Sequence, residues 1–393
     1  MPWKTDCSRE QRWKFVQEYL RRKTALAELC RRWSVSRKTA YKWIARFEEQ
    51  GRLGLVDRQR KARRVHNRPN SVWLARVQRW RARHPTWGPA KLRWALKRRF
   101  KSRCVPSESA IGRWLKAWKL SHRRRRVTRK GPAVDRPKLT IARRPNDVWT
   151  VDYKGWFKTA DGQRVEPLTI RDLASRYLLK IDLAGRQTVE DSRPAFEQVF
   201  RENGLPRVIR CDNGAPFGAT GALGLTRLSA WWVKVGIKVE FIEPGRPQQN
   251  GAHEQMHKVF KEEVPPAATL RRQKRRTERW RKQYNHQRPH RSLQMRVPAD
   301  VYRKSRRKMP GHLKHWRYQR TWESRLVKGK GMISLHGQSR FVGEAFEGER
   351  VGLKPIRVGI WEVYFGPLLI GELWESETGA IRAAHYRRGH RSK

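Results

Sequence analysis

Three carboxylates in the middle of the chain have the chemical type and the setting of a metal site. Asp152 ends one apolar run, and Asp212 ends a second one directly before the turn-forming pair Asn213-Gly214. Glu254 lies just inside a predicted helix that follows a loop rich in Pro, Gly and Gln. Two acids at strand ends and a third at the start of a helix can converge on a pair of hard cations.

The type of donor selects the metal and the reaction. Oxygen ligands without a His or Cys ligand cluster favour magnesium or manganese over zinc or iron. Two such ions can activate an attacking oxygen, brace the leaving oxygen and neutralise the phosphate between them. The expected cofactors are therefore two Mg²⁺ ions per active site, with Mn²⁺ able to substitute. Asp152, Asp212 and Glu254 are the expected ligands and catalytic residues, and the expected reaction is phosphoryl transfer.

Four motifs in one order carry a family resemblance. They are residues 149–152 (WTVD), 211–214 (CDNG), 247–254 (PQQNGAHE) and 284–290 (YNHQRPH). Together they resemble bacterial insertion-sequence transposases, which share the DDE catalytic core of retroviral integrases. The resemblance covers residues 146–303. The regions on either side resemble these proteins only in the order of their domains.

The resemblance implies a function and partners. The protein is expected to be a DNA transposase that binds transposon ends, nicks them and joins the freed 3′-hydroxyl to target DNA. Double-stranded DNA is the expected partner, with a homo-oligomer forming on it in the bacterial cytoplasm at the nucleoid. The resemblance also places Lys258 and Lys261 on the DNA-facing side of the helix that carries Glu254.

Composition agrees with a nucleic-acid partner. The chain has 393 residues, with 92 Lys and Arg against 35 Asp and Glu, a formal charge of +57. Self-repulsion of that size favours a polyanionic partner, and the even spread of charge suits nucleic acid better than a membrane. The four cysteines are scattered, which indicates neither a disulfide framework nor a zinc finger. No apolar signal segment or membrane-spanning run is evident, so a reducing cytosol is expected.

The first residues predict a helix-turn-helix. A helix over 8–21 is followed by one that Thr24 can cap and one that Ser36 can cap, ending before Gly51. The last of these would lie in the major groove. Its expected DNA-facing residues are Arg37, Lys38, Thr39, Lys42 and Arg46, with ordinary solvated charges as the alternative. Tyr41, Trp43, Ile44 and Phe47 are expected in the core.

A second helical unit is predicted after a basic linker. Helices are expected over 72–83, from Pro89 onward and from a cap at Ser107. This unit resembles the second helix-turn-helix found upstream of the core in many of these transposases, with a purely structural three-helix spacer as the alternative. The arginine-rich tract that follows is either a solvated tether or a phosphate contact.

The central region predicts a ribonuclease H-like sheet. Three strands are expected over 148–157, 166–173 and 177–183, followed by a helix from Thr188 that stops at Gly204. The strand ending at Asp212, a helix over 225–235 and a strand over 237–242 complete the pattern.

Helical geometry tests the third acid. Ala252, Met256, Val259 and Phe260 fall on one expected apolar face. Glu254, Lys258 and Lys261 fall on the opposite one, where a plain salt pair is the alternative. His253 and His257 are expected to be surface histidines, with assistance to proton transfer or DNA contact as the alternative. Asp172 is expected to stabilise a turn and is the reserve ligand if one of the three acids fails.

Two departures from the family pattern stand out. Asp212 and Glu254 are 42 positions apart, longer than is usual, and the excess fits a loop insertion in the Gly-rich segment 217–224. Gln255 stands where many relatives carry arginine. Neither departure removes an expected ligand.

The expected fold class is multidomain: N-terminal all-α helix-turn-helix units, a central α/β ribonuclease H-like integrase core and a C-terminal small β-barrel. The expected domains are a helix-turn-helix domain (1–57), a basic linker (58–68), a second helical domain (69–121), a basic linker (122–135), the catalytic core (136–303), a basic linker (304–330), the β-barrel (331–380) and a basic tail (381–393).

Two other functions remain open on sequence grounds. A domesticated, catalytically silent DNA-binding regulator would explain the helix-turn-helix units and the charge, but not three retained acids. A nuclease that hydrolyses strands without joining them would retain the same acids.

Overall fold

The computed structural model describes residues 8–57, 70–100, 104–121, 139–243 and 247–384. It divides the chain into two compact units, Met1–Asn70 and Ser71–Lys393. The expected linkers 58–68 and 122–135, and residues 385–393 of the expected tail, lie outside the described residues. No helix in the described part of the chain is long and apolar enough to cross a membrane.

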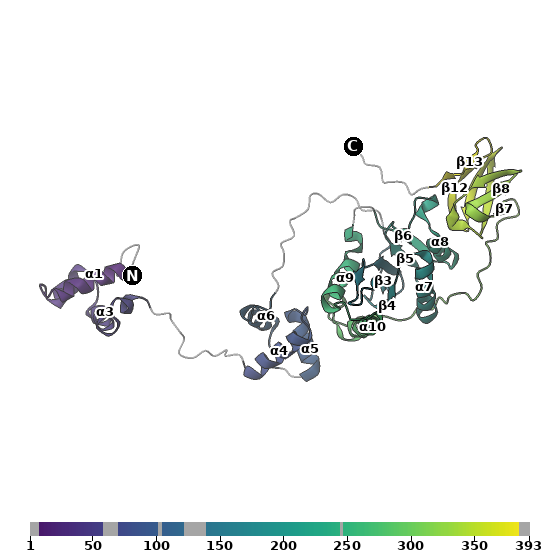
Figure 1. Ribbon diagram of the computed structural model, residues 1–393. Helices are drawn as coiled ribbons and strands as arrows, with labels where there is room; N and C mark the ends of the chain where they lie inside the picture. Colours follow the sequence, from purple (N-terminus) through teal and green to yellow (C-terminus); the bar gives the residue numbers. More distant parts are fainter. Residues whose placement is uncertain (1–7, 58–69, 101–103, 122–138, 244–246, 385–393) are drawn as a thin grey trace. The chain divides into compact units, whose positions relative to one another are not determined.

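The first unit is helical and has its own apolar core (Figure 1). It contains α1 (Ser8–Leu20), α2 (Leu26–Arg32), α3 (Arg37–Gln50) and the 3₁₀ helix η1 (Gly51–Leu55). The cap at Ser36 is confirmed, because its side chain accepts a hydrogen bond from the backbone N–H of Thr39. The expected cap at Thr24 is wrong. Helix α2 follows Ala25, which makes no side-chain capping bond.

The buried face of α3 differs from the expectation at Tyr41. Ala40, Trp43 and Ile44 are buried, and Phe47 packs against the same cluster. These four positions follow the i, i+3, i+4, i+7 spacing of one helix face. Tyr41 lies outside that stripe and is 61% exposed. It is therefore a surface residue beside the expected DNA-facing side chains.

Three helices open the second unit. They are α4 (Ser71–Arg83), α5 (Pro89–Phe100) and α6 (Glu108–Ala117). Ser107 caps α6 as expected, accepting from the backbone N–H of Ala110. Trp73, Leu92 and Ile111, one from each helix, are buried in a separate apolar cluster. The three helices thus form a local body with a core of their own.

A mixed sheet forms the centre of the second unit. Its strands are β1 (Val148–Tyr153), β2 (Phe157–Lys158), β3 (Arg164–Asp172), β4 (Leu178–Ala184), β5 (Val208–Cys211) and β6 (Lys238–Phe241). The order is β2-β3-β1-β5-β6, with β4 paired to β3. Strands β1, β3 and β4 pair antiparallel, whereas β1, β5 and β6 pair parallel. This arrangement matches the expected core.

Helices cover both faces of the sheet (Figure 1). They are α7 (Val189–Asn203), α8 (Arg227–Lys234), α9 (Gly251–Glu263), α10 (Leu270–Gln287) and the short α11 (Pro298–Val301), with 3₁₀ helices η2 (Ala222–Gly224), η3 (Pro247–Asn250) and η4 (Arg291–Leu293). Trp149 and Val151 of β1 pack with α7 and α8 in one cluster. Because strand residues alternate between faces, Thr150 and Asp152 point to the other face, where α9 lies.

The C-terminal part is rich in strands but not a closed barrel. Its strands are β7 (Glu323–Leu326), β8 (Met332–Leu335), β9 (Gln338–Phe341), β10 (Arg350–Arg357), β11 (Ile360–Phe365), β12 (Leu368–Trp374), β13 (Gly379–Ala380) and β14 (Arg382–Ala383), with 3₁₀ helices η5 (Gly329–Gly331) and η6 (Glu344–Phe346). They form two sheets, β14-β12-β11-β10-β7 and β13-β9-β8. Within the described residues neither sheet closes on itself, so the expected small barrel is replaced by two open sheets.

The 284–290 motif has a structural role in this fold. Asn285 of α10 is 1% exposed and meets strand β4 at its start. Its Oδ1 accepts from the backbone N–H of Leu178 at 2.8 Å, and its Nδ2 donates to the Leu178 carbonyl at 2.9 Å. The side chain therefore pairs both backbone groups of one strand residue.

Replacing Asn285 by alanine should destabilise the protein. The variant would leave a buried N–H and a buried carbonyl of β4 with fewer partners, which costs about 1–3 kcal/mol. The matched control is Gln283→Ala, an exposed position on the same helix, which should change stability by less than about 0.5 kcal/mol. Urea unfolding measures both; equal midpoints would contradict the role assigned to Asn285.

Candidate active site

The fold brings the first two acids to one edge of the sheet. Strands β1 and β5 are parallel neighbours in which Thr150 is paired with Arg210. Asp152 lies two residues after Thr150, and Asp212 two residues after Arg210. Because parallel strands end at the same edge, the two carboxylates are neighbours there.

The electrostatics of Asp152 connect all three acids. Burial, together with the negative charges of Asp212 and Glu254, raises the pKa of Asp152 to about 7. Burial also raises the pKa of Asp212 above its usual range. Like charges held close together favour a bound cation, since a cation relieves their repulsion.

The three carboxylates lie near one another, but their oxygens do not converge on a single metal position. Glu254 lies in α9 and is exposed to solvent. Within the described residues, no three His, Cys, Asp or Glu side chains converge closely enough to hold a metal ion. In those same residues the Oδ1 of Asp212 is buried and has no hydrogen-bond partner. An all-oxygen donor set with one orphaned carboxylate oxygen fits a hard divalent cation.

Gly214 allows the close turn at Asp212. A Cβ atom at Gly214 would lie 3.3 Å from Asp212 Oδ2, tighter than most real contacts. Beside it, Asn213 Nδ2 donates to the Ile242 carbonyl at 2.5 Å. The Asn213 contact thus ties the turn that follows Asp212 to the residue after β6.

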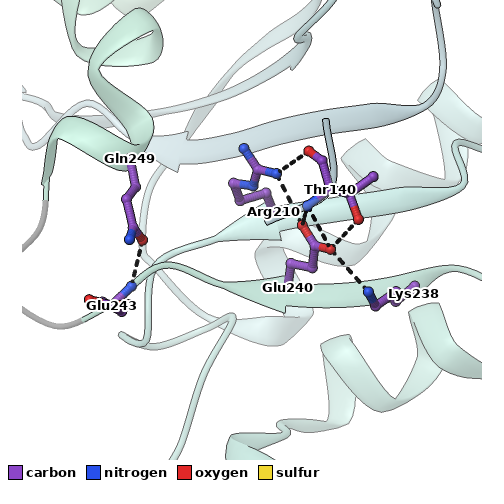
Figure 2. Close-up of polar contacts among 6 residues, drawn as sticks. All are labelled: Thr140, Arg210, Lys238, Glu240, Glu243 and Gln249. Carbon is purple, nitrogen blue, oxygen red and sulfur yellow. Dashed lines mark hydrogen bonds and ion pairs between the residues drawn. The ribbon is translucent and has the colours of Figure 1, made fainter. Parts of the chain in front are cut away.

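A buried ion pair supports this edge of the sheet (Figure 2). Arg210 and Glu240 are directly paired in β5 and β6, and their side chains are only 6% and 8% exposed. Arg210 Nη2 donates to Glu240 Oε2 at 3.1 Å and to the Thr140 carbonyl at 2.7 Å. Thr140 and Lys238 also donate to the Glu240 carboxylate. Arg210 lies two residues before Asp212 on the same chain segment.

The 247–254 motif also has a visible structural part. Gln249 Oε1 accepts from the backbone N–H of Glu243 at 2.9 Å (Figure 2). This contact joins the two sides of the segment between β6 and α9. It therefore helps to set where α9, which carries Glu254, begins.

The two histidines of α9 are buried, so their expected place on the surface is wrong. His253 is 0% exposed and His257 is 8% exposed. Burial lowers the pKa of His253 well below its usual value and that of His257 to about 3. The buried stripe of α9 is His253, Met256, His257 and Phe260. This i, i+3, i+4, i+7 stripe and the expected stripe of Ala252, Met256, Val259 and Phe260 each fit one helix face, so spacing alone did not decide between them.

The remaining residues singled out from the core sequence are two lysines of α9 and Asp172. Lys258 and Lys261 are exposed on α9, as is Glu254. Asp172 is fully buried; it accepts from the backbone N–H groups of Ser175 and Asn146, at 2.7 Å each. Its expected turn-stabilising role is confirmed, and it stays apart from the three acids.

The expected DNA-facing residues lie on α3 in the first unit. Arg37, Lys38 and Lys42 are exposed, and Thr39 and Arg46 are half-buried. The guanidinium of Arg46 and the ammonium of Lys42 lie over the Trp43 ring, 5.0 and 4.6 Å from its centroid. The Thr39 hydroxyl is engaged with Ser36 at 2.9 Å.

Comparison with known families matches separate stretches of the chain. The family described as Integrase core domain matches residues 142–247, and a second one of the same description matches 235–298. A Helix-turn-helix domain matches 11–64, a Homeodomain-like domain matches 39–115, and the IS481 family transposase C-terminal domain matches 322–376.

Two curated bacterial proteins are similar over the middle of the chain. An insertion element IS407 uncharacterized 31.7 kDa protein of Burkholderia multivorans is 28% identical over 186 residues, which cover 47% of this chain and 65% of that protein. An insertion element IS476 uncharacterized 39.2 kDa protein of Xanthomonas euvesicatoria is 30% identical over 181 residues, covering 45% and 50%. The chain thus spans half to two-thirds of these relatives.

A solved structure with a similar outline is the integrase catalytic core domain of HTLV-2 in complex with magnesium. It is 15% identical and covers 41% of this chain and 98% of that one, with a TM-score of 0.33. At that TM-score the likeness supports no further argument.

Proposed function

We propose that the chain, which matches the integrase core and is similar to bacterial insertion-element proteins, is a transposase that binds transposon ends, nicks them and transfers the 3′-hydroxyl strand into target DNA. The observation that carries this proposal is the placement of Asp152 and Asp212 at adjacent parallel strand ends. Glu254 lies close enough to raise the pKa of Asp152.

Asp152, Asp212 and Glu254 would hold two magnesium ions, with manganese able to substitute. When bound, such ions supply Lewis acidity and positive charge at a reacting phosphate. The chain's own contribution is to hold the turn that follows Asp212. Asn213 does this through its bond to the Ile242 carbonyl, and Gly214 leaves room for the carboxylate.

The basic surfaces would hold the DNA. Arg37, Lys38, Thr39, Lys42 and Arg46 would contact a transposon end from α3, and Tyr41 extends that exposed face. Lys258 and Lys261 would contact DNA beside Glu254. We also propose that the C-terminal sheets bind DNA and that the protein assembles as a homo-oligomer on DNA at the nucleoid, in the cytoplasm.

A strand-transfer assay tests the proposal. The purified full chain, Mg²⁺ and a DNA fragment carrying the terminal inverted repeats from beside its gene should give nicked ends and joined products from a labelled 3′-end. Hydrolysis without joined products would instead identify a nuclease. Binding without cleavage in Mg²⁺ or Mn²⁺ would identify a silent regulator, which the comparisons do not favour.

A further inference from the structure

The hydroxyl of Thr169 lies at the meeting point of three elements of the candidate site. Thr169 is fully buried in β3, directly paired with Asp152 of β1. Its Oγ1 lies 2.9 Å from the Asp152 carbonyl oxygen. The same atom lies 2.6 Å from Nε2 of His253 and 2.7 Å from Nε2 of His257, both on α9.

Only one arrangement of protons satisfies all three contacts. A hydroxyl has one hydrogen to donate and two lone pairs to accept with. The Asp152 carbonyl can only accept, so the Thr169 hydrogen goes to it. Both histidines must then donate from Nε2. This holds whether an imidazole is neutral or charged, because the charged ring also carries hydrogen on Nε2.

The second nitrogen of each ring follows from this assignment. In a neutral His253 ring Nδ1 is an acceptor, and it lies 2.8 Å from the Thr150 hydroxyl, which donates to it. The other contact of that hydroxyl, to the Arg171 carbonyl, is long at 3.5 Å. His257 turns its Nδ1 toward Asp152, 3.8 Å from Oδ2. One ring therefore braces β1, and the other faces an expected metal ligand.

The two histidines also fix the position of Glu254, because they belong to the same helix turns. His253 directly precedes Glu254, and His257 lies one helical turn beyond His253. Arg171 adds a further tie between β3 and the start of α9, since its Nη1 donates to the Ala252 carbonyl at 2.5 Å. The first turn of α9 is thus fixed against the strand end that carries Asp152.

We propose that Thr169 is a positioning residue of the metal site, whose hydroxyl sets the place of Glu254 relative to Asp152 through His253 and His257. The inference rests on the proposed function, because it assumes that these two acids share bound ions. It goes beyond that function by assigning the distance between them to one buried hydroxyl and two histidines.

Two substitutions of Thr169 separate positioning from simple packing. Thr169→Val keeps the shape but removes the hydroxyl, and it should weaken Mn²⁺ binding to the full chain about 10- to 100-fold. Thr169→Ser restores the hydroxyl and should recover most of that affinity. Thr277→Val is the matched control, because Thr277 is 2% exposed and its hydroxyl has no partner within the described residues. Its Mn²⁺ affinity should equal that of the wild type.

Titration of Mn²⁺ followed by electron paramagnetic resonance of the free ion measures these affinities without any DNA reaction. Wild-type affinity in Thr169→Val would overturn the inference while leaving the proposed function intact. Wild-type affinity in Asp152→Asn would overturn the proposed function itself. The two failures are therefore distinguishable in one set of titrations.

Histidine ¹⁵N spectra of the metal-free wild type keep the inference testable if Thr169→Val does not fold. Both His253 and His257 should carry hydrogen on Nε2. A ring with hydrogen on Nδ1 alone would overturn the assignment, whatever the metal affinities.

Discussion

Asp212→Asn should lower Mg²⁺-dependent joining of DNA ends by about a thousandfold or more. The amide has nearly the same shape as the carboxylate but lacks its charge. Loss of one charged ligand removes several kcal/mol of metal-borne stabilisation, at about 1.4 kcal/mol per tenfold in rate. The fold should persist, because an asparagine oxygen can still accept from the Gly214 backbone N–H that now bonds Asp212.

The control for this variant is Asp182→Asn. Asp182 lies on β4 beside Lys180 and is paired with Leu168, so its side chain points to the face of the sheet opposite Asp152. Quantified strand-transfer products from a labelled 3′-end should be unchanged in the control and reduced about a thousandfold or more in Asp212→Asn, with both proteins binding the same DNA. Full joining activity in Asp212→Asn would remove the basis of the enzyme assignment.

Glu240→Ala should lower the free energy of unfolding by about 3–5 kcal/mol, since it leaves the Arg210 guanidinium buried without its carboxylate. Within the described residues, the Arg210 Nη2 atom would keep only the Thr140 carbonyl as a hydrogen-bond partner. The loss should exceed that of Lys238→Ala, whose side chain is 67% exposed and whose pairing contributes less than about 1 kcal/mol.

The effect of Glu240→Ala should depend on pH in a defined direction. Burial alone would raise the pKa of Glu240, but hydrogen bonds from Thr140, Lys238 and Arg210 outweigh it, so the folded-state pKa lies below the usual value. Its contribution is therefore full above the unfolded pKa of about 4.3 and is lost as pH falls through the folded value. Urea unfolding at pH 7 and at pH 3 should show the difference from wild type shrinking at low pH. A constant difference would argue against the ion pair.

Local chemistry was predictable from the sequence. Ser36, Ser107 and Thr188 cap their helices as expected, because a cap depends on residues within one turn of it. The strand ends that carry Asp152 and Asp212 were also predictable, since apolar runs followed by turn residues mark them.

Features that depend on distant partners were not predictable. The burial of His253 and His257 requires knowing that α9 faces the threonines of β1 and β3. A sequence pattern predicts a polar residue to be exposed, because its buried hydrogen-bond partners are distant in the chain and cannot be identified from it. Closure of the C-terminal strands depends likewise on pairing between distant segments, and the two sheets stay open.

One apolar cluster runs from Trp149 of the central sheet through Trp232 of α8 to Phe346 and Phe365 of the C-terminal part. Lys234 of α8 also pairs with Glu349. Deleting residues 323–393 would therefore expose apolar side chains of α8 to solvent and should make the remaining chain more prone to aggregate. By the same reasoning, DNA bound to the C-terminal sheets would keep a fixed position relative to Asp152 and Asp212, because one apolar cluster joins those sheets to the central sheet.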